Sequence, residues 1–205
     1  MISLFLNTSS NFLHIALIKE NEVLQEKYLK LDKALSKEAL INIKYLSEEC
    51  NLKPSDIEEI ICVRGPGSFT GLRVGVTIAK TYAYFLNKKL YSVSSLDVMA
   101  TSINDEIIVP LIDARRGYVY GAIYDQNYNI LLKEQYLKLE ELKQKAESYH
   151  KQITYISNDE FSDLKTVKYK PNLNNTLKNF KKKEEDSLTF IPTYLKKTEA
   201  EEKLQ

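Results

Sequence analysis

A glycine-rich stretch in the first half of the chain has residue types that can bind an anion. Residues 65–75 read GPGSFTGLRVG and hold four of the chain's six glycines. Glycine permits positive φ angles and close backbone approach, and free N–H groups at the start of a helix attract anions. The same residues also suit a tight strand-to-helix connection that binds no ligand. The loop itself comprises Gly65, Pro66, Gly67, Ser68, Phe69, Thr70 and Gly71.

The spacing of this loop matches neither common nucleotide-binding fingerprint. A Walker loop needs GxxxxGK[ST], and a Rossmann loop needs an unbroken GxGxxG with an acidic residue after a later strand. The sequence has neither pattern. Thr70 or Ser68 can instead cap a helix that begins near Gly71. We therefore predict a structural loop and no cofactor.

Few other residues have the spacing of a catalytic site. The chain has two histidines, His14 and His150, and two cysteines, Cys50 and Cys62. No HxxxH, CxxC or GxSxG pattern occurs, so neither a zinc site nor a nucleophile elbow is predicted. Both cysteines fall in apolar patterns and are expected to be small buried residues. We expect no catalytic residue and no metal ligand.

Two polar residues, Asn7 and Asp113, each follow an apolar run. An amide at position 7 is a poorer partner for Mg²⁺ than a carboxylate. Asp113 is followed closely by Arg115 and Arg116, which indicate either an anion or partner contact or an Asp-started turn with solvated arginines. The turn is the favoured interpretation.

The composition is typical of a globular protein. The chain has 205 residues, of which 43% are apolar, and a formal net charge of +1. A chain of this size can bury a core without disulfides or metals, and its balanced charge gives no bulk field for nucleic acid or membrane. The N-terminus lacks a basic region, and no run approaches the ~20 apolar residues of a membrane helix. We expect a cytoplasmic protein with no membrane partner.

Apolar periodicity predicts alternating strands and helices. Ser36 is the expected N-cap of the first helix, and the charged run 181–186 is expected to be a solvated turn. The predicted elements of the first half are strands at 2–6, 12–18 and 23–31, a helix at 35–50, a strand at 57–63, a helix at 72–86, a strand at 90–93 and a short helix at 95–102.

The strand pattern then repeats. Residues 4–7, 12–17 and 26–31 align in order with residues 110–113, 118–123 and 134–139, and both copies are followed by a helical segment. Shared strand propensity explains some of this likeness, but three blocks in order favour duplication. The predicted fold class is α/β: a duplicated actin-like (ASKHA or ribonuclease H-like) two-lobe fold with mixed sheets. The expected lobes are residues 1–103 and a smaller lobe at 104–205.

The helix predicted at 72–86 has two apolar stripes. At about 100° per residue, one stripe comprises Leu72, Val76, Ala79, Ala83 and Leu86. The second comprises Val74, Ile78 and Phe85. A surface helix on a small sheet needs only one apolar stripe, so the second must be covered by the 35–50 helix or by a partner subunit.

Four segments resemble the TsaB family, also called YeaZ. GPGSFTGLRVG looks like its diagnostic motif, and residues 93–96 resemble its GVSSL segment. Residues 111–120, LIDARRGYVY, resemble its DARRGEVY hairpin, and residues 192–201 resemble its PxYLR…AE ending. The resemblance spans the whole chain, although Asn7 stands where relatives often have Asp and residues 151–186 match weakly.

The resemblance implies a non-catalytic scaffold or activating subunit in the synthesis of N6-threonylcarbamoyladenosine (t6A) in tRNA. The implied partners are a TsaD-type catalytic subunit, a TsaE-type ATPase and, without them, a second copy in a homodimer. Contact with tRNA would be only indirect. The expected contact residues are Leu35, Ala39, Ile43, Leu46, Leu72, Arg73, Val74, Val76, Ile78, Lys80 and Phe85.

Two enzyme classes remain as alternatives. An autonomous actin-like ATPase or kinase should have an acidic residue at position 7 and a glycine-rich adenosine loop in the second lobe, and the sequence has neither. A metallopeptidase-like enzyme should have a metal-binding histidine pair, which is also missing.

Overall fold

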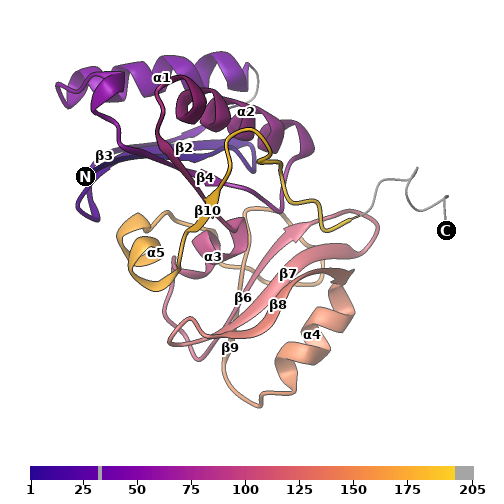
Figure 1. Ribbon diagram of the computed structural model, residues 1–205. Helices are drawn as coiled ribbons and strands as arrows, with labels where there is room; N and C mark the ends of the chain where they lie inside the picture. The colour runs from indigo at the N-terminus through magenta and orange to yellow at the C-terminus, as the bar shows by residue number, and fades with distance from the viewer. Residues whose placement is uncertain (32–33, 197–205) are drawn as a thin grey trace. The chain divides into compact units, whose positions relative to one another are not determined.

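The computed structural model describes residues 1–31 and 34–196, which form two compact units (Figure 1). The first unit contains residues 1–95 and 173–192. The second contains residues 96–172 and the described residues 193–196. Each unit has its own sheet and its own hydrophobic core.

The first unit is built on a six-stranded mixed sheet with the strand order β10-β5-β4-β1-β2-β3. Strand β1 pairs antiparallel with β2 and parallel with β4, and β10 adds antiparallel to β5. Its elements are β1 (Ile2–Asn7), β2 (Phe12–Lys19), β3 (Glu22–Lys30), α1 (Leu35–Glu49), a 3-10 turn η1 (Pro54–Asp56), β4 (Glu59–Val63), α2 (Phe69–Phe85), β5 (Lys89–Val93), α5 (Leu173–Asn179) and β10 (Lys183–Glu185).

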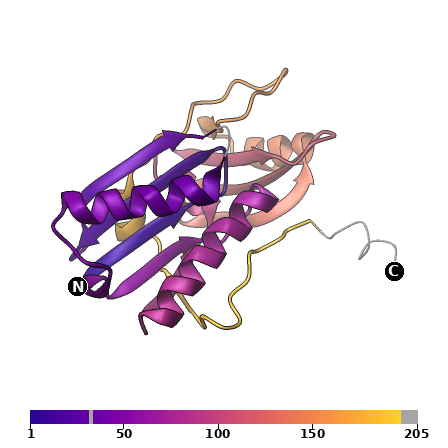
Figure 2. The same ribbon diagram turned by 90° about the horizontal axis from the view of Figure 1, so that it is seen from above.

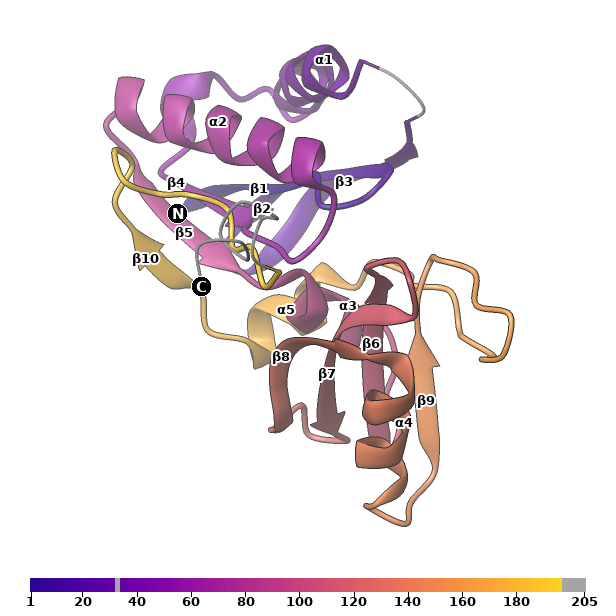
Figure 3. The ribbon, with the colours of Figure 1, turned by 90° about the vertical axis from the view of Figure 1, so that its right-hand side faces the viewer.

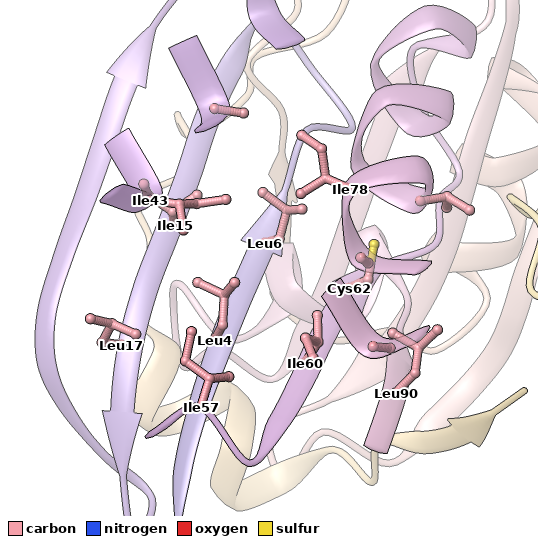
Figure 4. Close-up of a cluster of buried hydrophobic side chains, with 14 of the residues drawn as sticks. Leu4, Leu6, Ile15, Leu17, Ile43, Ile57, Ile60, Cys62, Ile78 and Leu90 are labelled. Atoms are coloured by element: carbon pink, nitrogen blue, oxygen red, sulfur yellow. The ribbon is translucent and has the colours of Figure 1, made fainter. Parts of the chain in front are cut away.

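Helices α1 and α2 cover one face of this sheet, as Figures 2 and 3 both show. Alternate residues of each strand point toward the helices, since side chains along a strand alternate between faces. Leu13, Ile15 and Leu17 of β2 are fully buried in this way. They join Ile43 of α1 and Ile78 of α2 in one cluster, part of which is drawn in Figure 4.

The second unit repeats the arrangement on a smaller scale. Its sheet has the order β8-β7-β6-β9, and α4 packs on one face over Val109, Leu111 and Ile123. Its elements are α3 (Ser95–Ala100, whose first residue belongs to the first unit), β6 (Ile107–Asp113), β7 (Tyr118–Asp125), β8 (Ile130–Lys138), α4 (Leu139–Glu147) and β9 (Ile153–Ile156).

The two sheets confirm the predicted duplication. In each, a first strand pairs antiparallel with the second and parallel with the strand that follows the helix. The third strand pairs antiparallel with the second in both units. The chain therefore has the predicted α/β fold with mixed sheets, in two topologically equivalent lobes.

The C-terminal part of the chain differs from the predicted lobe boundaries and turn. The units divide between Ser95 and Leu96 rather than near residue 103, and residues 173–192 return to the first unit. The run 181–186 is not the solvated turn that was expected, because its residues 183–185 form β10. Lys182 in this run binds the buried carboxylate of Glu59, which lies far away in the sequence.

The start of α1 also differs from the expectation. Ser36 does not cap the helix, because Leu35 is already helical and the N-cap position is Ala34. Ala34 has a left-handed backbone with φ of 58° and makes no side-chain cap bond. The hydroxyl of Ser36 is thereby placed on the helix surface.

Candidate partner-binding groove

The glycine-rich loop packs against the turn that joins β1 to β2. A Cβ atom on Gly67 would lie 2.2 Å from the carbonyl oxygen of Ser9, and one on Gly71 would lie 2.1 Å from that of Thr8. A Cβ atom on Gly75 would lie 2.2 Å from Oγ1 of Thr8. These three positions need glycine because the turn between β1 and β2 occupies the space of a side chain, with its backbone at Gly67 and Gly71 and with the Thr8 side chain at Gly75.

Hydrogen bonds join the same two segments. The Ser68 amide donates to the Ser9 carbonyl at 2.7 Å, and Thr8 Oγ1 donates to the Gly71 carbonyl at 2.8 Å. Ser68 Oγ accepts from the Gly71 amide at 3.2 Å and caps α2. The helix thus begins at Phe69, earlier than predicted, with Ser68 rather than Thr70 as its cap. Packing and capping account for Gly67, Ser68 and Gly71 of the loop.

Asn7 and Asp113 have the same local role in the two lobes. Each ends the first strand of its sheet, and each accepts a hydrogen bond from the backbone two residues on. Asn7 Oδ1 accepts from the Ser9 amide at 2.9 Å and from Ser9 Oγ at 2.7 Å. Asp113 Oδ1 accepts from the Arg115 amide at 2.8 Å. Both side chains therefore build turns, as this motif commonly does.

Most of the expected contact residues lie inside the first unit. Six of the eleven have side chains that are at most 7% exposed, and they pack between the sheet and the two helices. A partner cannot reach these side chains while the unit stays folded, except where Ile78 meets the groove described below. The six residues are Ala39, Ile43, Leu46, Leu72, Val76 and Ile78.

The other five lie nearer the surface. Leu35 and Val74 are half-buried, while Arg73 and Phe85 are exposed, Phe85 by 78%. Lys80 is half-buried, and its Nζ donates to the carbonyl oxygen of Leu188 at 2.9 Å. The amine of Lys80 is therefore already engaged by the first unit's own C-terminal segment.

An open groove of about 390 Å³ runs between α1 and α2. Its lining is mostly apolar, and Leu40 on α1 is 47% exposed. Arg73 lines the groove and lies over the ring of Phe69, with 3.8 Å between the guanidinium carbon and the ring centroid. We call it the α1–α2 groove; it is lined by Ser36, Leu40, Arg73, Val74, Thr77, Ile78, Thr81 and Tyr82.

The two helices expose further apolar side chains. Tyr45 of α1 is 51% exposed, and Tyr84 of α2 is 58% exposed. Tyr84 and Phe85 meet edge to face, with 5.4 Å between their ring centroids. Scattered apolar residues are normal on a surface, but an open apolar groove between two helices that also expose aromatic side chains is typical of an interaction site.

Sequence reasoning missed five of the groove residues. Thr77 belongs to neither apolar stripe of α2, and Leu40 directly follows Ala39 of the buried face of α1. A signal was present, because Ser36 and Leu40, like Thr77 and Thr81, stand four residues apart and so share a helix face. The missed residues are Ser36, Leu40, Thr77, Thr81 and Tyr82.

A buried histidine lies on the opposite face of the first sheet. The ring of His14 is fully buried, and Nε2 donates to Oε2 of Glu26 at 2.9 Å. This hydrogen bond lowers the pKa of Glu26. Phe5 and Tyr28 meet the imidazole edge to face. Within the described residues, His14 Nδ1 has no hydrogen-bond partner.

Neither a metal centre nor a membrane span emerges from the part of the chain that the structure describes. No group of three His, Cys, Asp or Glu side chains there is arranged to hold a metal ion. None of the helices in that part has the length and hydropathy to cross a membrane. Burial raises the pKa of the Cys62 thiol to about 12, so this thiol stays protonated.

Comparisons with known proteins agree on one family. The family model described as TsaD, tRNA N6-adenosine threonylcarbamoyltransferase, matches residues 23–200. The tRNA threonylcarbamoyladenosine biosynthesis protein TsaB of Bacillus subtilis is 39% identical over 133 residues, which are 64% of this chain and 58% of that protein. TsaB of Buchnera aphidicola is 26% identical over 179 residues, covering 82% of this chain and 80% of that protein.

A solved structure agrees with the fold. YeaZ from Pseudomonas aeruginosa superposes with a TM-score of 0.73 at 20% identity, covering 95% of this chain and 99% of that chain. The matched stretch spans less than two thirds of the B. subtilis protein. The chain belongs to the family of the TsaD model and, within it, to the TsaB (YeaZ) proteins.

Proposed function

We propose that this chain acts in the synthesis of threonylcarbamoyladenosine in tRNA as a non-catalytic subunit, which docks on a TsaD-type catalytic subunit through the α1–α2 groove. The observation that carries the proposal is the apolar groove on the two helices next to the family motif. The names of the relatives supply the pathway. The groove supplies a surface on which a partner helix can bury its apolar side chains.

The chemistry of the groove favours a protein partner over a small polar substrate. Its apolar lining comes from Val74, Ile78 and Tyr82 of α2 and from Leu40 of α1, which is 47% exposed. Arg73 adds one cation, held over the Phe69 ring. A partner helix with apolar residues at every third or fourth position and an acidic residue near Arg73 would be complementary to it.

The non-catalytic role is supported by what Asn7 does. Its amide oxygen accepts two hydrogen bonds within its own turn. An amide held in this way offers less to a metal-bound water than the free carboxylate expected of an actin-like ATPase. The subunit would then stimulate the reaction by stabilising an active arrangement of its partner, to the extent that it binds that arrangement more tightly.

The same groove would mediate self-association when the catalytic subunit is absent. An exposed apolar surface of this kind is energetically unfavourable in water, and two copies can cover it in a symmetric dimer. The TsaD-type subunit would compete with the second copy. A TsaE-type ATPase would join as a further component, and no surface on this chain is assigned to it.

The test is a charge placed in the groove. Leu40→Glu should weaken binding to the TsaD-type subunit of the same organism by about 2 kcal/mol or more, roughly 30-fold, since a carboxylate would be buried without a partner. Leu24→Glu is the matched control: Leu24 is 44% exposed, against 47% for Leu40, and does not line the groove.

Isothermal titration calorimetry measures the binding, and light scattering measures the dimer of the isolated chain. Circular dichroism confirms that both variants are folded. If folded Leu40→Glu binds the catalytic subunit and dimerises as tightly as Leu24→Glu, the groove is not the docking surface.

A further inference from the structure

Three tyrosines gather on one face of the second unit's sheet, near the hairpin between β6 and β7. Tyr120 and Tyr136 are register partners on adjacent strands, so their side chains share this face. The rings of Tyr118 and Tyr136 stack, with 4.8 Å between centroids and 12° between planes. The rings of Tyr120 and Tyr136 lie 5.7 Å apart. All three side chains are half-buried, so the stack is partly open to solvent.

Basic side chains surround this stack. Lys138 is the register partner of Tyr118 and therefore shares its face. The Nζ atom of Lys196 lies 5.6 Å from the centroid of the Tyr136 ring. Arg115 and Arg116 form the tip of the hairpin immediately before Tyr118, and both are exposed. Two carboxylates at the base of the hairpin accept backbone hydrogen bonds: Asp113 Oδ1 from the Arg115 amide and Asp159 Oδ2 from the Asp113 amide, both at 2.8 Å.

The hairpin tip gives no structural reason for arginine. Arg115 has a φ angle of 68° and Arg116 one of 56°. This left-handed region favours Asn, Asp and Gly, and it is unfavourable for a long side chain. Within the described residues, neither guanidinium makes an ion pair or a hydrogen bond. The turn thus holds two unengaged cations beside an aromatic stack.

We propose that this surface binds single-stranded RNA, with a base stacked on the tyrosines and phosphates held by the arginines and Lys138. We call it the tyrosine–arginine platform; its members are Arg115, Arg116, Tyr118, Tyr136 and Lys138. Base stacking on aromatic rings combined with cations for the phosphates is the common means of binding unpaired strands. An acidic protein would use the cations but has no need of a parallel stack.

The platform lies in the second unit, whereas the proposed docking groove lies in the first. The inference rests on the proposed function only for the choice of tRNA as the natural ligand. It adds a direct RNA contact to a subunit for which the family resemblance implies only indirect contact with tRNA.

The test is fluorescence anisotropy with a labelled single-stranded oligoribonucleotide, titrated with the full chain, alone and in complex with the TsaD-type subunit. The platform should bind the single strand in preference to the same sequence as a duplex. The affinity should fall steeply as salt rises, since cations on the protein replace the counterions of the phosphates.

Two variants address the two parts of the platform. Arg115→Gln/Arg116→Gln should weaken RNA binding about tenfold and flatten its salt dependence. Lys133→Gln/Lys151→Gln is the matched control, since it removes two exposed cations of the same unit toward the other end of β7 and β8, where Lys151 acts on the carboxylate of Asp125. Tyr118→Leu should also weaken binding about tenfold, while Tyr118→Phe, which keeps the ring, should bind as the wild type does.

The outcomes separate this inference from the docking proposal. Leu40→Glu should leave RNA binding by the isolated chain unchanged. If the wild type binds no RNA in either form, or if the arginine variant binds as its control does, the platform is not an RNA site. If Arg115→Gln/Arg116→Gln no longer binds the TsaD-type subunit but still binds RNA, the surface is a protein contact and the inference is wrong. This variant tests the inference even if Tyr118→Leu fails to fold.

Discussion

The glycine-rich motif is explained by the backbone that lies against it. The side-chain space of Gly71 and Gly75 is filled by Thr8, and that of Gly67 by Ser9. A diagnostic motif that suggests a ligand loop therefore serves here to seat α2 on the β1–β2 turn. The anion site that the sequence left open is not needed to account for these residues.

The packing explanation predicts the sign of the stability change caused by Gly71→Ala. Gly71 is helical, so alanine alone should stabilise by up to about 1 kcal/mol. We expect destabilisation by about 1–3 kcal/mol instead, because the new Cβ would meet the Thr8 carbonyl oxygen at 2.1 Å. Urea unfolding measures the difference, and Thr70→Ala, on the exposed neighbour, is the control. A more stable Gly71→Ala variant would contradict the packing account.

The hydrogen bond between His14 and Glu26 makes the stability of the fold depend on pH in the acidic range. The hydrogen bond from His14 holds the pKa of Glu26 below its ordinary value of 4.5. A carboxylate with a depressed folded-state pKa stabilises the protein above 4.5, and this contribution is lost as pH falls through the lower folded pKa. Glu26→Gln should therefore be less stable than wild type at neutral pH and lose less stability below pH 4.5.

The measurement is the urea midpoint as a function of pH. Glu22→Gln, an exposed carboxylate on the same strand, is the control and should follow the wild-type profile. Parallel profiles for Glu26→Gln and wild type would show that the bond adds no stability. The side chain of Glu26 is 43% exposed, so we expect a small effect.

The amphipathic pattern of helix α2 predicts one of its two apolar stripes correctly and the other only in part. The wheel identified two stripes, and residues of the first, such as Leu72 and Ala79, are buried on the sheet. The second stripe divides: Ile78 is 7% exposed, whereas Phe85 is 78% exposed. Periodicity gives the direction of a side chain but not the distance to the neighbouring helix, so α1 could not be positioned from sequence.

The same limit applies elsewhere in the fold. The duplicated strands were predictable because each lobe repeats its apolar pattern in order. Strand β10 was not, because a charged three-residue strand has no apolar alternation. Lys182 and Glu59 meet only through the tertiary fold, and Ser36 looked like a cap because local sequence does not report the backbone of Ala34.

Two substitutions on α2 separate its core from its groove. Ile78→Glu should destabilise the chain by more than about 3 kcal/mol, because the carboxylate would be buried without a partner. Val74→Glu, on the half-buried wall of the groove, should cost about 1 kcal/mol or less and keep the fold. Thermal unfolding followed by circular dichroism compares them. Equal stability of the two variants would mean that Ile78 is as accessible as Val74.

At the scale of the whole molecule, the chain leaves the first unit and returns to complete it. Residues 173–192 supply α5 and the edge strand β10 to the sheet that begins at residue 2. Long-range polar contacts secure this return. Ser92 Oγ donates to Glu185 Oε1 at 2.7 Å, and the Val23 amide donates to Asn174 Oδ1 at 3.3 Å. The sheet of the first unit is therefore completed by residues from two distant parts of the sequence.

The central contact of this return is the pair of Lys182 and Glu59. Glu59 is 2% exposed, and its Oε1 accepts from Ser3 Oγ at 2.6 Å as well as from Lys182 Nζ. The Lys182 ammonium also lies 4.4 Å from the centroid of the Tyr91 ring. The carboxylate therefore depends on a cation from a segment more than a hundred residues away in sequence.

Lys182→Met should leave the buried carboxylate of Glu59 with Ser3 as its remaining side-chain partner. We expect the free energy of unfolding to fall by about 2–3 kcal/mol. This is at the low end for a buried ion pair, because the Lys182 side chain is 28% exposed. The double variant Lys182→Met/Glu59→Gln should recover part of the loss, since a neutral amide is less costly to bury than an unpaired charge. Urea unfolding of the four members of this cycle gives the coupling energy. Lys181→Met, the exposed residue just before Lys182, should leave the unfolding midpoint nearly unchanged. If Lys182→Met behaves as Lys181→Met does, the returning segment is held by its strand pairing with β5 and not by this ion pair.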